Sequence, residues 1–166
     1  MNERVLGDVT GDGPQYMTLV FPYDSTGILL GMKKEGFGKG RWNGFGGKVK
    51  EGEQLKDAAV RELKEECGLE ASPDDLVEAG ILNFYPYYCV VFVYGYRVKG
   101  DLRQERPVET EEMIPRRFAN EEIPFDQMWA DDSYWLPLFL KGIPFVGEFH
   151  FNGDDSVREW SLEGMP

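Results

Sequence analysis

Three glutamates, Glu62, Glu65 and Glu66, lie within five residues of one another. On a helix these positions are i, i+3 and i+4, which places three carboxylates on one face within one turn. Carboxylates this close raise one another's pKa, and a divalent cation removes that cost. Oxygen ligands without histidine or cysteine select a hard ion, Mg²⁺ or Mn²⁺. The common alternative is a solvated helix face, on which Arg61 and Lys64 pair with the acids.

The segment that carries these glutamates has the pattern of a helix. Gln54 to Cys67 is rich in helix-forming residues, and Leu55, Ala59 and Leu63 recur every four positions. Gly68 follows directly and is a typical helix stop. Lys33 to Lys48, by contrast, is rich in glycine and predicts a loop.

The remaining patterns predict a mixed sheet. β-branched and aromatic residues predict strands over Tyr16–Phe21, Ile28–Met32, Val77–Tyr85, Cys89–Val98 and Met113–Phe118, a charged connection over Lys99–Thr110, and a final hairpin of Phe145–Phe151 with Val157–Leu162. A second helix is expected within Asp126–Gly142, at least from Asp131 onward. This order predicts an α+β fold, with one domain over residues 16–166 after a flexible arm of residues 1–15.

Composition excludes several classes of function. A net charge of −12 argues against binding of nucleic acid polymers, but a divalent cation can bridge the chain to a small polyphosphate. Since His150 is the single histidine, sites built on several histidines are excluded. No run of about 18 apolar residues predicts a membrane helix, and the first 15 residues lack the apolar core of a secretory signal. Cys67 and Cys89 are therefore expected as free thiols in the cytoplasm, with mitochondrial or nuclear fractions left open.

The wider spacing around the glutamates resembles the Nudix box, G-x5-E-x7-R-E-U-x-E-E-x-G-U with U aliphatic. Gly47 is followed by Glu53, then by Arg61-Glu62-Leu63, Glu65-Glu66 and Gly68-Leu69, so all nine specified positions match. Nudix proteins hydrolyse nucleoside diphosphates linked to another group. The resemblance implies an α/β/α sandwich in which the box forms loop–helix–loop and its carboxylates bind Mg²⁺.

The resemblance extends beyond the box, from about Tyr16 to Trp160. The stretches GFGKGRWNGFGGKV at Gly36–Val49 and MWADDSYW at Met128–Trp135 look like the MutT homologues of animals. Those Nudix hydrolases act on oxidised purine nucleoside triphosphates, such as 8-oxo-dGTP and 2-oxo-dATP. The resemblance implies attack by water at the β-phosphorus, giving a nucleoside monophosphate and pyrophosphate.

The resemblance also implies roles for individual residues. The implied metal ligands are the Gly46 backbone, Glu62, Glu65, Glu66 and Glu112, of which Glu112 also orients the attacking water. Arg61 is implied to hold the loop on the helix, through Glu53, without acid–base work. The implied nucleotide-binding residues are Thr18, Lys33, Phe37, Asn43, Phe84, Met113, Trp129, Asp131 and Asp132.

Several alternatives stay open at this point. Asp131 and Asp132 are either base-reading acids that hold one proton between them or a helix N-cap. In one strand register Phe84 points into the pocket. If the register differs by one residue, Asn83 or Tyr85 points inward instead. The function is either hydrolysis of oxidised purine nucleotides by a monomer, hydrolysis of ADP-ribose, a dinucleoside polyphosphate or an alkylated guanine nucleotide, or silent nucleotide binding.

Overall fold

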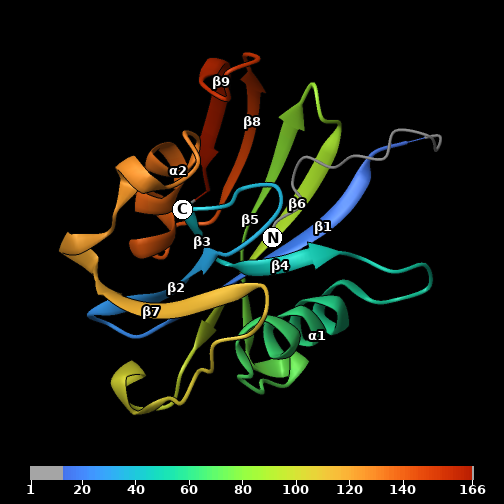
Figure 1. Ribbon diagram of the computed structural model, residues 1–166. Coiled ribbons are helices and arrows are strands. Elements are labelled where there is room, and N and C mark those ends of the chain that lie inside the picture. The colour runs from blue at the N-terminus through green and yellow to red at the C-terminus, as the bar shows by residue number, and fades with distance from the viewer. Residues whose placement is uncertain (1–12, 166) are drawn as a thin grey trace.

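The computed structural model describes residues 13–165 as one mixed sheet with two helices (Figure 1). The strands are β1 (Gln15–Tyr23), β2 (Gly27–Lys33), β3 (Trp42–Asn43), β4 (Phe45–Lys48), β5 (Leu76–Tyr85), β6 (Cys89–Arg97), β7 (Met113–Ala119), β8 (Phe145–Phe151) and β9 (Val157–Gly164). The helices are α1 (Leu55–Cys67) and α2 (Asp132–Leu140), and single 3-10 turns cover Pro73–Asp75, Leu102–Gln104, Asn120–Glu122 and Phe125–Gln127.

The sheet is organised around β1. The strand order is β3-β2-β1-β6-β5-β8-β9, with β4 paired to β1 and β7 paired to β2. β1 runs parallel to β6 along its whole length, and β5 runs parallel to β8, whereas the other pairs are antiparallel. The predicted hairpin of β1 with β2 forms, but it has one register pair, Tyr23 with Ile28. The rest of the same edge of β1, from Met17 to Val20, pairs with β4, and the opposite edge pairs with β6.

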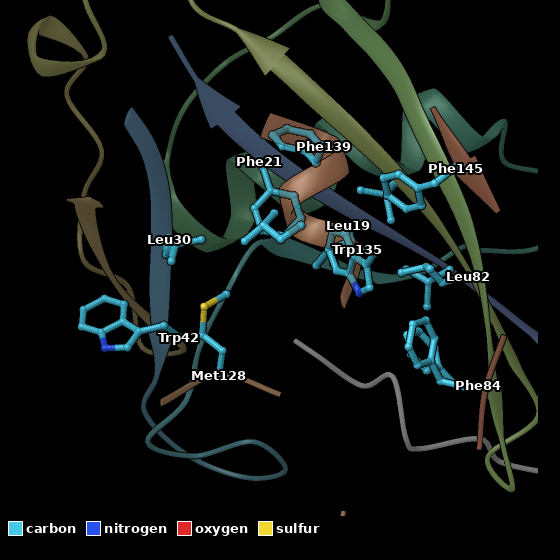
Figure 2. Close-up of a cluster of buried hydrophobic side chains, with 14 of the residues drawn as sticks. Leu19, Phe21, Leu30, Trp42, Leu82, Phe84, Met128, Trp135, Phe139 and Phe145 are labelled. Carbon is cyan, nitrogen blue, oxygen red and sulfur yellow. The ribbon is translucent and has the colours of Figure 1, made fainter. Parts of the chain in front are cut away.

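Each face of the sheet carries an apolar cluster and a helix. On the α2 side the core holds Phe21, Leu82, Trp135 and Phe149 among its fully buried members (Figure 2). On the α1 side Phe45 packs with the helix stripe that Ala59 and Leu63 provide. The predicted α+β class with a mixed sheet and helices on it is confirmed.

Helix α1 has the boundaries that the sequence predicts. Gly68 ends it with φ 78°, in the left-handed region that glycine adopts without steric cost, and its N–H donates to the Lys64 carbonyl. This stop places the glutamates in the last turns of the helix. Glu62 and Glu66 face the β4 segment.

The prediction of a loop over Lys33–Lys48 is wrong for its second half, which forms β3 and β4. The glycines that indicated a loop serve close packing between strands instead. A Cβ on Gly46 would lie 1.8 Å from the Thr18 carbonyl oxygen of β1, and a Cβ on Gly47 would lie 2.7 Å from the Glu62 carboxyl carbon. Glycine is required at Gly46 because the backbone of β1 approaches it closely, whereas at Gly47 the neighbouring atoms belong to the end of the Glu62 side chain.

Other expectations concern the ends of the chain and its connections. Most of the predicted flexible arm, residues 1–12, lies outside the described residues, and Gln15 already belongs to β1. The charged connection is not wholly solvated, because Leu102 is buried in it. Along residues 13–165 neither helix is long and apolar enough to cross a membrane.

Candidate active site

The three glutamates differ sharply in exposure. Glu66 is 1% exposed, the Glu62 side chain is 15% exposed and the Glu65 side chain is 55% exposed. A solvated helix face does not bury a carboxylate in this way, since an ionised group in an apolar interior is costly. The triplet therefore turns one edge toward β4 and the other toward water.

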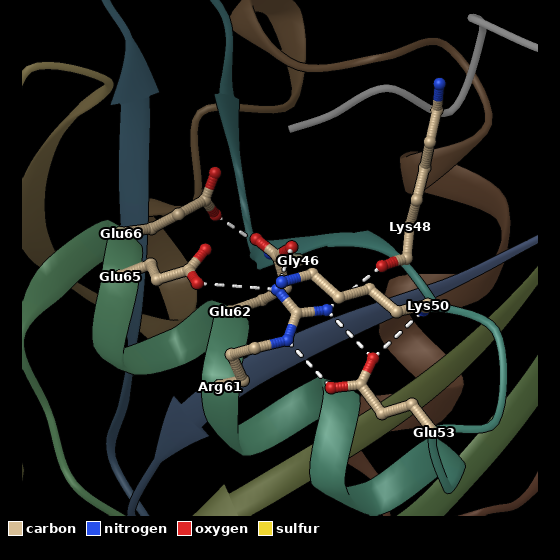
Figure 3. A network of polar contacts seen from close by, with 8 residues as sticks. All are labelled: Gly46, Lys48, Lys50, Glu53, Arg61, Glu62, Glu65 and Glu66. Carbon is tan, nitrogen blue, oxygen red and sulfur yellow. Dashed lines mark hydrogen bonds and ion pairs between the residues drawn. The ribbon is translucent and has the colours of Figure 1, made fainter.

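Arg61 holds the segment between β4 and α1 against the helix (Figure 3). Its Nε and Nη2 donate to the two carboxylate oxygens of Glu53, at 2.7 and 2.9 Å, and Nη2 also donates to the Lys48 carbonyl at 3.2 Å. Its Nη1 donates to Glu62 at 2.9 Å and, more weakly, to Glu65 at 3.5 Å. All donors of the guanidinium fork thus hold acids or backbone in place, in the orienting role that the sequence predicts.

Glu53 provides a test of this clamp that does not depend on activity. The hydrogen bonds from Arg61 lower the pKa of Glu53 to about 2. Because the pKa is lower in the folded state, the stabilisation is present above the unfolded value of about 4.5 and is lost as pH falls through about 2. We expect Glu53→Gln to lower the free energy of unfolding by about 1 kcal/mol at pH 7, since water reaches part of the pair.

Denaturant unfolding of wild type and Glu53→Gln at pH 7, 4 and 2.5, in chelator, measures this difference. The difference in the free energy of unfolding between the two proteins should shrink steadily as the pH falls. Glu51→Gln, an exposed neighbour, serves as the control. A difference that stays constant with pH would show that the charged pair is not its source.

Glu66 is the most perturbed acid of the site. Burial, with smaller effects from the nearby Glu62 and a hydrogen bond with Glu112, raises its pKa to about 7, and the Gly46 N–H, 2.9 Å from Oε1, opposes this rise. Burial also raises the pKa of Glu62, against the pull of Arg61. Buried acids that accumulate like charge are typical of sites that receive a cation.

Two residues that the sequence did not single out hold the segment of Glu112 in place, Thr110 against helix α1 and Lys34 against the end of β2. The Thr110 hydroxyl donates to the Glu66 carbonyl at 3.0 Å and accepts from the N–H groups of Glu112 and Met113. Lys34 N–H donates to the Glu112 carbonyl at 2.9 Å. No sequence signal marks Thr110, since a threonine in a charged loop has many possible roles.

The oxygen atoms of the site fit a hard divalent cation, although the carboxylates do not lie around one common point in this structure. Among residues 13–165 no three Asp, Glu, Cys or His side chains are grouped as a metal shell. Glu62 and Glu65 instead contact the Arg61 guanidinium. The carboxylates and the Gly46 backbone nevertheless offer oxygen alone, the chemistry that Mg²⁺ and Mn²⁺ prefer.

A second group of predicted residues lies in the interior. The polar or charged residues that are buried within the described part of the chain are Thr18, Asn43, Glu66, Asp131 and Asp132. Each of them is a residue for which the sequence predicts a functional role. Folding tolerates a buried polar group when it is hydrogen-bonded or when a ligand completes it.

Asp131 is not a side-chain cap of α2. It occupies the N-cap position but has helical φ and ψ and makes no capping hydrogen bond. Its Oδ2 instead accepts from the Trp135 indole N–H at 2.7 Å. The N-cap alternative is therefore wrong for Asp131, and the carboxylate is held in the core by a fully buried tryptophan.

Thr18 and Asn43 each carry an unsatisfied atom. Asn43 Oδ1 accepts from the Gly44 N–H at 2.8 Å, whereas its Nδ2 and the Thr18 Oγ1 are buried without a hydrogen-bond partner among residues 13–165. An unsatisfied buried donor costs about 1–3 kcal/mol. These two atoms are therefore suited to the polar edge of a ligand.

Trp129 is contacted by an aromatic ring and by a cation. The Phe37 ring stacks on it with ring centres 4.8 Å apart and planes 17° apart, and the Arg41 guanidinium carbon lies 4.0 Å from its ring centre. These two contacts fix the position of the indole in the structure.

The other predicted nucleotide-binding residues lie in different parts of the fold. Phe84 is fully buried in the α2-side cluster, against Phe149 and Phe151, so Phe84 and not Asn83 or Tyr85 faces that core. Met113 belongs to the α1-side cluster and is not brought together with Phe84. Lys33 lies at the end of β2, where its backbone bonds Gly40 and Arg41.

A family model described as "NUDIX domain" matches residues 14–139, which includes the whole glutamate site. The chain belongs to the Nudix family. Two curated relatives support this assignment over nearly their whole length. This Nudix protein is 46% identical over 145 residues to the oxidized purine nucleoside triphosphate hydrolase of Mus musculus, covering 87% of this chain and 92% of the relative. It is 44% identical over 147 residues to the protein of the same name from Danio rerio, covering 89% and 93%.

Solved structures agree on the Nudix fold. A mutator MutT protein from Bacillus halodurans superposes with a TM-score of 0.73 at 21% identity, covering 90% of this chain and 97% of that one. A Nudix hydrolase from Nitrosomonas europaea gives a TM-score of 0.66 at 19% identity, covering 84% and 81%. The predicted Nudix fold, with helices on a mixed sheet, is confirmed.

Proposed function

We propose that this Nudix protein hydrolyses oxidised purine nucleoside triphosphates, such as 8-oxo-dGTP and 2-oxo-dATP, to the nucleoside monophosphate and pyrophosphate. The observation that carries the proposal is the set of buried polar side chains. Glu66 belongs to the phosphate end, and Thr18, Asn43, Asp131 and Asp132 offer donors and acceptors for a purine edge. The names of the mouse and zebrafish relatives support the same substrate class.

The phosphate end is assigned to the Nudix box. Glu62, Glu65, Glu66, Glu112 and the Gly46 carbonyl would hold Mg²⁺, or Mn²⁺ in its place. When bound, the ion supplies the positive charge that offsets charge developing on the attacked phosphate. Glu112, on an exposed loop that Thr110 ties to α1, orients the attacking water and takes up its proton.

The base end is assigned to side chains that read its edge. Asp131 is held by the Trp135 indole N–H and offers its carboxylate to the edge of the base, and Asn43 Nδ2 donates to an acceptor such as an oxidised ring carbonyl. A protonated aspartic acid donates and an ionised one accepts, so the adjacent Asp131 and Asp132 suit both oxidised guanine and oxidised adenine. The proposed function takes the protein to act as a monomer.

The proposed setting follows from composition. The net charge of −12 disfavours nucleic acid polymers as partners, and a nucleotide with its cation is accepted more readily. Cys67 and Cys89 are both buried and form no disulfide within residues 13–165, and we place the protein in a reducing compartment such as the cytoplasm.

A nucleotide panel tests the proposal. Purified protein with Mg²⁺ is assayed with 8-oxo-dGTP, dGTP, 2-oxo-dATP and ADP-ribose, and kcat/KM is compared. We expect 8-oxo-dGTP to exceed dGTP by at least about 10-fold, because a site built to bond an oxidised edge leaves polar groups unpaired with the normal base. Chelation should abolish hydrolysis. Equal rates for 8-oxo-dGTP and dGTP, or a preference for ADP-ribose, would contradict the proposal.

Asp131→Asn tests the base-reading role. Asparagine keeps an oxygen for the Trp135 indole but changes the donor pattern toward the base. We expect the ratio of kcat/KM for 8-oxo-dGTP to kcat/KM for 2-oxo-dATP to change by about 10-fold, the size of one or two altered hydrogen bonds. The exposed Asp126→Asn is the matched control. An unchanged ratio in Asp131→Asn would remove Asp131 from base recognition.

A further inference from the structure

A chain of contacts joins Tyr87 to Trp129. The Tyr87 hydroxyl donates to Asp155 Oδ1 at 2.8 Å, and Asp155 Oδ2 lies 3.7 Å from Arg41 Nη1. The Arg41 guanidinium in turn lies over the Trp129 ring at 4.0 Å. These residues come from the β5–β6 turn, the β8–β9 turn, the loop before β3 and the segment before α2. Four separate parts of the chain are thus connected at Trp129.

Backbone strain lies in both turns that Tyr87 and Asp155 join. Tyr88, next to Tyr87, has φ 53°, and Asp155 has φ 67°. Non-glycine residues adopt this left-handed region at a cost of about 1 kcal/mol or more, and a bulky tyrosine does so rarely. The turns keep these conformations, and the Tyr87–Asp155 hydrogen bond connects them.

The donor in this contact stays protonated. Burial, and secondly the bond to Asp155, raises the pKa of Tyr87 to about 12. Asp155 therefore accepts from a neutral hydroxyl on one oxygen and keeps the other for Arg41. Both charged side chains are partly exposed, so their attraction is screened and depends on Tyr87 to hold the carboxylate in place.

The two groups that contact Trp129 are held differently. Arg41 is tied to Asp155, whereas Phe37 is half-buried in a loop between Gly36 and Gly38, whose φ values of 78° and 85° mark it as a glycine-dependent turn. Arg41 is therefore the contact of Trp129 that Tyr87 and Asp155 can control.

We propose that Tyr87 and Asp155 are positioning residues for base recognition, which hold Arg41 against Trp129 and so keep the indole in place for the purine. This inference rests on the proposed function, because it assigns Trp129 to the base site. Tyr87 and Asp155 act through Arg41 and do not touch the nucleotide. A preformed wall reduces the ordering cost that binding must otherwise meet.

Enzyme kinetics separate this role from a merely structural one. We expect Tyr87→Phe to raise KM for 8-oxo-dGTP about 3- to 10-fold with kcat within about 2-fold, since uniform binding is lost and the phosphate end is untouched. Arg41→Lys should raise KM at least as much, because an ammonium does not stack flat on an indole. The double variant should match Arg41→Lys alone, because Tyr87 acts through Arg41. Tyr88→Phe, which removes a hydroxyl one residue along, should leave KM unchanged.

A second measurement needs no nucleotide. Tryptophan emission should differ between wild type and Tyr87→Phe, and the difference should vanish when both carry Trp129→Phe. A normal KM in Tyr87→Phe, additive effects with Arg41→Lys, or an emission difference that survives Trp129→Phe would overturn the inference. Failure of wild type to hydrolyse 8-oxo-dGTP would instead overturn the proposed function, and the emission comparison would still decide whether the contacts reach Trp129.

Discussion

Replacing Glu66 by glutamine is expected to lower kcat/KM for 8-oxo-dGTP by at least about 10²-fold, the size of effect that follows loss of a charged group at a transition state. Glutamine has the same shape, and its amide oxygen can still accept from the Gly46 N–H. It cannot supply the negative charge that a divalent cation requires. Because burial already raises the pKa of Glu66 to about 7, the interior should accept the neutral side chain and the fold should persist.

Steady-state assays with saturating Mg²⁺ measure the loss, and thermal unfolding in chelator shows that the protein stays folded. Glu70→Gln is the matched control, since Glu70 is an exposed glutamate paired with Lys64 just beyond the helix. It should retain wild-type kcat/KM. More than about a tenth of wild-type activity in Glu66→Gln would contradict the assignment of Glu66 to the metal site.

The second large effect is expected on stability. In Gly46→Ala the new Cβ would lie 1.8 Å from the Thr18 carbonyl oxygen and 2.9 Å from the Leu19 Cα, so β4 must move away from β1. Both contacts are backbone atoms, which do not rotate aside as a flexible side chain does. We expect a loss of about 3 kcal/mol or more, at or above the upper range for overpacked interiors, and a fall in Tm on the order of 10 °C.

Denaturant and thermal unfolding of the purified variants measure this loss. Gly153→Ala is the control, because its Cβ would meet no atom within 4 Å in the β8–β9 turn. That variant should unfold within about 1 °C of wild type, as surface substitutions usually do. A Gly46→Ala protein as stable as wild type would show that the close approach of β4 to β1 is not required.

The sequence predicted those parts of the site that local patterning encodes. The apolar stripe of Leu55, Ala59 and Leu63 and the stop at Gly68 define a helix without tertiary information, and the glutamates follow from it. The strands of β5, β6 and β8 were predictable for the same reason, since their composition is locally consistent. The burial of Asp131 and Asp132 agrees with a prediction that rested on resemblance and not on patterning.

The rest depends on contacts between distant segments. From chain flexibility alone, Gly44, Gly46 and Gly47 indicate a loop. In the structure they lie where neighbouring backbone or side-chain atoms leave little room for a Cβ. The roles of Thr110 and Asp155 could not be predicted from the sequence, because each depends on a hydrogen bond with a residue far along the chain. A local pattern also does not reveal that Met113 and Phe84 face different clusters.

The parallel pairing of β1 with β6 has a consequence for how the chain folds. β1 is made early, yet its longest partner strand is complete only when Arg97 has been synthesised. Until then its apolar residues find only β2 and β4 as partners. Parallel, non-local pairings of this kind close long loops before they gain contacts, which slows folding and leaves strand edges exposed to other chains. The strand that pairs with β4 beside the glutamates is therefore also one that stays without its longest partner while the chain is being made.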